Sequence, residues 1–201
     1  MNFLAIETST NICSVALFNN NKLIKSDRTD IPKSHSKELA VMIKKILNDS
    51  LIKVNSLNFI ALSSGPGSFT GLRIGSSVAK GIAYSLSLPI VMVPTLHSLA
   101  IQINSKEKCS IALYSHKNNI YIQDFNNYKP CSEIKLIEVN NGMKKTLYGF
   151  ELEKADESLQ FIKVKPSAES IGILAIKNYK KWLVEDLTKA KLNYITNLKI
   201  N

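Results

Sequence analysis

Hydrophobic and polar positions repeat with two different periods along this chain, and each change of period marks an expected element. Residues 3 to 8, 12 to 18 and 22 to 28 are short apolar runs joined by Asn-rich turns, which predicts three strands in an antiparallel meander. Residues 36 to 49 change to helical spacing, and Ser36 is the expected N-cap. The apolar stripe of this helix consists of Leu39, Met42, Ile43, Ile46 and Leu47.

A strand, helix and strand follow the first helix. The run "LNFIALSSG" predicts a strand, residues 69 to 86 predict a long helix, and "PIVMV" predicts a second strand. A unit of this length implies a right-handed crossover between parallel strands. The element order up to this point is that of the ribonuclease H-like lobe of sugar kinases, actin and chaperone ATPases, although order alone is a weak guide to function.

Strands begin again at about residue 106, after the polar stretch "NSKEK". Four apolar runs predict them: "CSIALYS", "NIYIQDF", "SEIKLIEV" and "LQFIKVK". A helix over about residues 167 to 184 closes the chain. We therefore expect an α/β protein with a first lobe at 1–105 and a smaller, shortened second lobe at 106–201.

Composition narrows the function classes. The 201 residues include 45% hydrophobic and 21% charged residues, with no apolar run of membrane-spanning length, so we expect a cytoplasmic protein without membrane contact. The three cysteines suit buried thiols in a reducing compartment, and the three histidines have no metal-ligand spacing, so no metal or other cofactor is expected. The net charge of +10 divides evenly between the two halves, which favours a general lysine bias over a dedicated nucleic-acid surface.

The glycine-rich stretch "SSGPGSFTGLRIGSSVAKGIAYS" raises the question of an active site. A glycine turn between a strand and a helix can bind phosphate, but the pattern fits neither the Walker nor the dinucleotide motif. The turn after the first strand, at Glu7, Thr8, Ser9 and Thr10, is a second candidate, as a vestigial phosphate loop. Together with Ser68 as a nucleophile, it keeps open the alternative of an independent ATP-binding or hydrolytic enzyme.

The long helix carries a different signal. Gly71, Gly75, Ala79 and Ala83 recur every four residues and form a ridge of small side chains, which permits close approach of a second helix. Two readings stay open: the two amphipathic helices pack only on their own sheet, or they also present a surface to another protein. The second reading predicts a partner interface at Leu39, Met42, Ile43, Ile46, Gly71, Leu72, Arg73, Gly75, Ala79 and Ala83.

Three segments resemble the bacterial TsaB (YeaZ) family in order and spacing. They are "FLAIETSTNICSVALF", "SHSKELAVMIKKIL" and "LNFIALSSGPGSFTGLRIGSSVAKGIAYSLSLPIVMVPTLHSLA", and the segment "GPGSFTGLRIG" is the most specific. The resemblance covers roughly the first 100 residues. In the second lobe, "LYSHKNNIYI" lacks the acid and the arginine that the family usually has in this turn.

The resemblance implies a two-lobed ribonuclease H-like fold of the actin and sugar-kinase type, and a function in tRNA modification. It implies a non-catalytic dimerisation subunit of the complex that forms N6-threonylcarbamoyladenosine at position 37 of tRNAs reading ANN codons. The implied partners are a TsaD-like catalytic subunit, which the two helices of the first lobe would bind, and a TsaE-like ATPase. A homodimer through the same face and weak direct contact with tRNA are further expectations.

Overall fold

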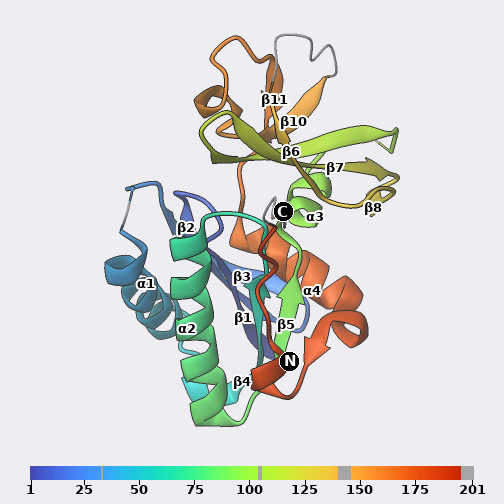
Figure 1. Ribbon diagram of the computed structural model, residues 1–201. Helices are drawn as coiled ribbons and strands as arrows, with labels where there is room; N and C mark the ends of the chain where they lie inside the picture. The colour runs from blue at the N-terminus through green and yellow to red at the C-terminus, as the bar shows by residue number, and fades with distance from the viewer. Residues whose placement is uncertain (33, 104–105, 140–145, 196–201) are drawn as a thin grey trace.

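The first sheet has six strands in the order β12-β5-β4-β1-β2-β3 (Figure 1). The computed structural model describes all residues except 33, 104–105, 140–145 and 196–201. The predicted meander is confirmed, because β1 to β3 pair antiparallel, and β4 and β5 then extend the sheet in parallel, as the crossover requires. The strands are β1 (Asn2–Glu7), β2 (Cys13–Asn19), β3 (Lys22–Thr29), β4 (Leu57–Ser63), β5 (Ile90–Val93) and β12 (Leu183–Val184).

Alternate side chains of these strands pack into two separate hydrophobic cores, one on each face of the sheet. Leu4 and Ile6 face one side, where α1 (His35–Asp49) and α2 (Phe69–Leu86) cover the sheet. Phe3 and Ala5 face the other side, beneath α4 (Ala168–Trp182). This period-two division explains why the strands read as nearly continuous apolar runs: a sheet covered on both faces has no polar side.

The second sheet has the order β11-β10-β6-β7-β8, and β9 pairs with β7. Its strands are β6 (Cys109–His116), β7 (Asn119–Asn126), β8 (Lys129–Pro130), β9 (Lys135–Glu138), β10 (Leu147–Phe150) and β11 (Phe161–Lys163). The short helix α3 (Thr95–Ala100) lies between the two sheets (Figure 1). The remaining helical turns are η1 (Val54–Ser56), η2 (Leu152–Lys154) and η3 (Leu187–Lys189).

Two expectations need correction. Residues 106–201 were assigned to the second lobe, but α4 packs on the first sheet and β12 pairs with β5, so the end of the chain returns to the first lobe. The expected N-cap Ser36 lies inside α1, which begins at His35 with Ser34 as its N-cap. Within the described ranges no helix combines the length and the apolar character needed to cross a bilayer.

Candidate functional site

An apolar groove of about 720 Å³ lies between α1 and α2, which run side by side on the first sheet (Figure 1). Ile43 and Leu47 are nearly buried in it, and Val78 and Ile82 of α2 are half buried. The turn after α1 adds side chains that are largely in water. The full lining is Ala40, Ile43, Lys44, Leu47, Asn48, Leu51, Ile52, Lys53, Val54, Val78 and Ile82.

Leu51 is the most unusual residue of this groove. It is 92% exposed and its backbone is left-handed, with φ of +54°. The N–H of Leu51 donates to the carbonyl of Asn48 and that of Ile52 to the carbonyl of Leu47, both at 3.1 Å. This is the Schellman ending of a helix, in which the left-handed position favours glycine. Leucine is less favourable than glycine in this backbone conformation, so the stability of the isolated chain does not explain its presence. The exposed apolar side chain therefore indicates a role at the surface.

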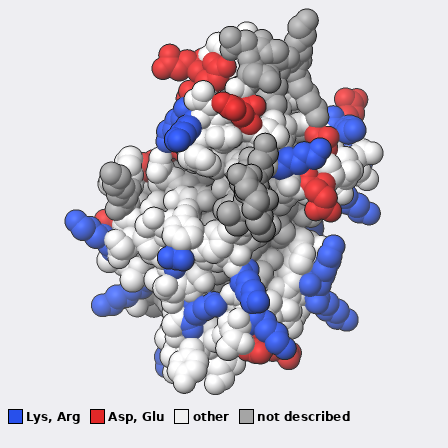
Figure 2. Space-filling model, viewed as in Figure 1, with Lys and Arg blue, Asp and Glu red and all other residues white. Residues whose placement is uncertain are grey.

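The charges around the groove are of one sign. Lys44 and Lys53 are exposed at its rim, and its lining includes no acidic residue. Figure 2 shows that uncharged side chains cover most of the surface over α2, and the charged side chains among them are Lys or Arg. The groove is therefore complementary to an apolar helix face flanked by carboxylates.

The structure places nine of the ten predicted interface residues beneath the surface. Arg73 is exposed, whereas the other nine are buried within this chain. The stripe and the small-residue ridge therefore mainly hold α1 and α2 on their own sheet, and of the nine only Ile43 also lines the groove. The buried residues are Leu39, Met42, Ile43, Ile46, Gly71, Leu72, Gly75, Ala79 and Ala83.

Two glycines of α2, Gly71 and Gly75, are explained by contact with the turn after β1 rather than with another helix. A Cβ on Gly71 would lie 2.2 Å from the carbonyl oxygen of Thr8, and one on Gly75 would lie 2.2 Å from the Thr8 Oγ1. A Cβ on Gly81, further along the helix, would meet no atom within 4 Å. The small-residue pattern predicts close approach of a second helix, but at Gly71 and Gly75 the approaching element is this turn.

The proposed phosphate turn is closed. Glu7, Thr8, Ser9 and Thr10 are all buried, and the Ser9 N–H donates to the Glu7 Oε1 at 2.6 Å. The Ser68 N–H, at the start of α2, donates to the Ser9 carbonyl at 2.6 Å. The backbone N–H groups of Ser9 and Ser68 are thus engaged within the protein, whereas Thr8 Oγ1 and Ser9 Oγ are buried without a hydrogen-bond partner. Burial raises the pKa of Glu7 to about 7, although hydrogen bonds from Ser9 partly oppose this shift.

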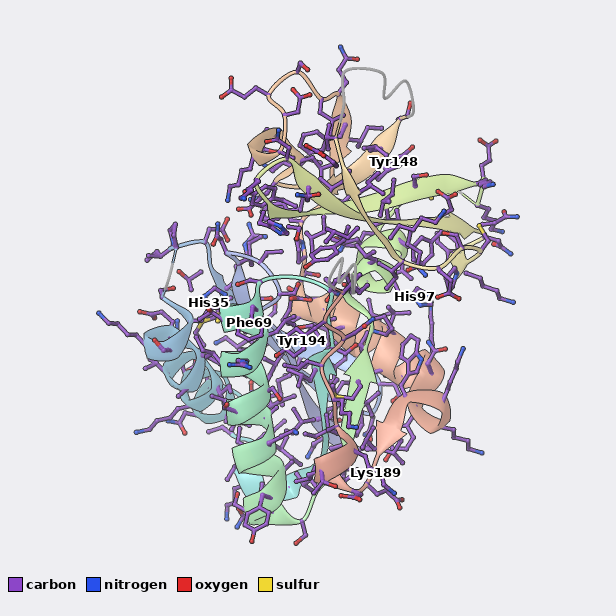
Figure 3. All side chains as sticks on the ribbon, viewed as in Figure 1. His35, Phe69, His97, Tyr148, Lys189 and Tyr194 are labelled. Carbon is purple, nitrogen blue, oxygen red and sulfur yellow. The ribbon has the colours of Figure 1, made fainter. Side chains whose placement is uncertain are left out.

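The exposed residues at the N-terminal end of α2 stack on one another. The guanidinium carbon of Arg73 lies 3.8 Å from the centre of the Phe69 ring, which contacts the Tyr194 ring with centroids 5.0 Å apart. Figure 3 shows Phe69 and Tyr194 side by side between α2 and the C-terminal segment. The Arg73 guanidinium thus lies over an aromatic ring. Ser68 caps α2, because its Oγ accepts from the Gly71 N–H.

Comparison of this chain with known proteins shows the family to which it belongs. The model of the family described as "TsaD: tRNA N6-adenosine threonylcarbamoyltransferase" matches residues 29–191. A tRNA threonylcarbamoyladenosine biosynthesis protein TsaB from Buchnera aphidicola subsp. Schizaphis graminum is 33% identical over 189 residues, covering 84% of this chain and 90% of the relative. The chain belongs to the TsaB (YeaZ) family. The family resemblance seen in the sequence is thereby confirmed.

Further TsaB and YeaZ proteins agree with this membership. TsaB of Escherichia coli K12 is 39% identical over 100 residues, which is 50% of this chain and 43% of that protein. A solved structure named YeaZ, from Pseudomonas aeruginosa, has a TM-score of 0.77 at 22% identity and covers 96% of this chain and 99% of its own. The two-lobed ribonuclease H-like fold predicted from the sequence is confirmed.

Sequence reasoning missed the groove itself. Leu51, Ile52 and Val54 follow the periodic part of α1, and the periodicity predicts nothing for them. The available signal was the run of apolar side chains in "DSLIKVN", where a surface turn would ordinarily be polar. The left-handed backbone of Leu51 and its exposure depend on the fold and carry no local pattern.

Proposed function

We propose that this chain is a non-catalytic docking subunit of the machinery that forms N6-threonylcarbamoyladenosine in tRNA. Its groove between α1 and α2 binds a catalytic subunit of the TsaD type. The observation that carries the proposal is the exposed apolar turn at Leu51, kept in a left-handed backbone beside an apolar groove. The reaction is inferred from the family, whose members are named for threonylcarbamoyladenosine biosynthesis.

The partner chemistry follows from the lining of the groove. A helix pair with an apolar ridge can fill the space between α1 and α2, and its acidic side chains would face Lys44 and Lys53. By the family resemblance, the modified base is adenosine 37 of tRNAs that read ANN codons, and a TsaE-like ATPase joins the assembly. A homodimer through the same groove would compete with the catalytic subunit.

The non-catalytic assignment is supported by the closed turn after β1. Glu7 and Ser9 have no path to a substrate while α2 packs on them, and the Ser68 hydroxyl serves as a helix cap. The rival enzyme would need these groups exposed.

Reconstitution tests this proposal. TsaD and TsaE are incubated with tRNA, threonine, bicarbonate and the enzyme that makes the threonylcarbamoyl adenylate, with and without this chain, and modified adenosine is measured. We expect product only when the chain is present, and equal product with the Glu7→Gln variant. Loss of product with Glu7→Gln in a complex that still assembles would instead indicate a catalytic chain.

A further inference from the structure

A second pocket, of about 440 Å³, lies at the C-terminal end of α2. Figure 1 shows α1 on one side of α2 and η3 with the C-terminal segment on the other. The pocket is on the η3 side, because Leu187 of η3 contributes to its wall. We call it the Tyr84 pocket, and it combines Tyr84 and Glu185 with the apolar side chains of Ala83, Leu88, Pro89 and Leu187.

Tyr84 is the most exposed aromatic residue in the part of the chain that the structure describes, at 82%. The other two exposed aromatic residues, Phe69 and Tyr194, contact each other, and Arg73 lies over the Phe69 ring. The described residues supply no ring or cation contact to Tyr84. Its ring is therefore available to a cation or a ring of a partner.

Glu185 is held at the opposite wall of the pocket by the segments on either side of it. Val184 pairs with β5 in the first sheet, and Leu187 packs against the core beneath α1 and α2. The carboxylate of the next residue, Asp186, is engaged, since its Oδ1 accepts from the Thr188 N–H at 3.0 Å. Within the described ranges, the Glu185 carboxylate has no ion pair. It is therefore free to pair with a cation from outside the chain.

The parts of the Tyr84 pocket fit one kind of side chain, an arginine. A guanidinium can stack on the Tyr84 ring and donate two parallel hydrogen bonds to the Glu185 carboxylate. The aliphatic stem of the arginine can pack on the apolar side chains of the wall. An acidic side chain or a phosphate would meet Glu185 as a like charge, so the pocket disfavours both.

The exposed surface of α2 joins the Tyr84 pocket to the groove. Tyr84 follows Ile82 of the groove by two residues, which at about 100° per residue places the two side chains on opposite flanks of the helix. Ser77 and Gly81 project between these flanks, and both are small and exposed. A Cβ on Gly81 would meet no atom within 4 Å. A protein that lies along α2 can therefore reach both flanks at once.

We propose that the Tyr84 pocket receives an arginine side chain of the same catalytic subunit that docks in the groove. This inference rests on the proposed docking function and adds a polarity to it. Acidic side chains of the partner face Lys44 and Lys53 on the α1 side, whereas its arginine faces Glu185 on the η3 side. The two opposite charges set the orientation of the partner along α2 and disfavour a partner with the reverse pattern.

Calorimetric titration of the TsaD-type subunit into variants of the full chain tests the inference. Tyr84→Ala should weaken binding at least about fivefold, whereas Tyr84→Phe keeps the ring and should bind within about twofold of wild type. Glu185→Gln should weaken binding at least about threefold, and less at about 1 M salt, where charges are screened. Glu185→Lys introduces a like charge and should weaken binding at least about tenfold. Glu157→Gln removes an exposed acid of the second lobe and is the matched charge control, expected to bind normally.

The groove variant Val54→Asp separates failure of this inference from failure of the docking proposal. If Val54→Asp weakens binding while Tyr84→Ala and Glu185→Lys bind as wild type does, groove docking stands and the arginine site is overturned. If the wild-type chain does not bind the catalytic subunit, both are overturned.

Two further outcomes would identify another occupant and overturn the arginine site. Weaker binding by Tyr84→Ala without any effect of Glu185→Lys would indicate an apolar side chain in the pocket. Loss of self-association by Glu185→Lys in sedimentation experiments, with wild-type affinity for the catalytic subunit, would indicate a second copy of this chain. Thermal melts check that the variants fold, which is expected because both side chains are exposed.

Discussion

Replacing Leu51 by glycine should separate the stability of this chain from its affinity for a partner. A left-handed residue with a side chain costs about 1–2 kcal/mol, and glycine removes that cost. Glycine also raises the entropy of the unfolded chain, which offsets about 0.4–1 kcal/mol of the gain. Since the leucine side chain is 92% exposed, little packing is lost. The free energy of unfolding of Leu51→Gly should therefore equal the wild-type value or exceed it by up to about 1.6 kcal/mol.

Affinity should move in the opposite direction. Full burial of a leucine side chain contributes about 1.5–3 kcal/mol, and almost all of this surface is available for burial in the complex. A loss of about 2 kcal/mol corresponds to roughly 30-fold weaker binding of the TsaD-type subunit.

Two measurements check both halves of this prediction. Urea unfolding of the isolated chain gives its stability, and calorimetric titration with the catalytic subunit gives its affinity. Leu51→Met keeps an apolar side chain of similar size and is the matched control, expected to bind within about threefold of wild type. Wild-type affinity in Leu51→Gly would refute the reasoning, because it would show that Leu51 is not buried by the partner.

Three further predictions concern the isolated chain. Gly75→Ala should destabilise it by about 1–3 kcal/mol in urea, because the new Cβ would lie 2.2 Å from Thr8 Oγ1; a neutral effect would contradict the close packing. Gly81→Ala, on the same helix with open space around it, should stabilise the chain by about 1 kcal/mol, and a loss of stability would count against that open space. The raised pKa of Glu7, about 7 against 4.5 in the unfolded chain, means that the folded state holds a proton that the unfolded state releases. Stability should therefore fall as the pH rises from about 4.5 to 7, by up to about 1.4 kcal/mol per pH unit, and level off above that. Parallel pH profiles of wild type and Glu7→Gln would contradict this.

The sequence predicted the elements of the first lobe well, because their periodicity is local. The α2 helix has the bounds expected from its pattern, residues 69 to 86. Its orientation could not be predicted, since Gly71 and Gly75 meet Thr8, which lies over 60 residues away in the chain. A small side chain predicts that another segment packs closely against it, but it does not identify that segment.

The site depended still more on long-range structure. The return of α4 to the first sheet is a tertiary contact across the whole second lobe. The exposure of Leu51 follows from a helix ending whose left-handed position favours glycine and here holds leucine. The Tyr84 pocket combines side chains from α2, from the turn before β5 and from the segment after β12, and no local pattern marks such a set.

The most direct test of the account compares two Val→Asp substitutions in a titration with the TsaD-type subunit. Val54 lines the groove and is 39% exposed, whereas Val41 is 60% exposed on α1 and does not line it. Both variants should fold, since neither valine belongs to the buried core. We predict that Val54→Asp weakens binding at least about tenfold and that Val41→Asp binds as wild type does. Equal affinities of Val54→Asp and wild type would contradict the claim that the groove between α1 and α2 is the docking surface.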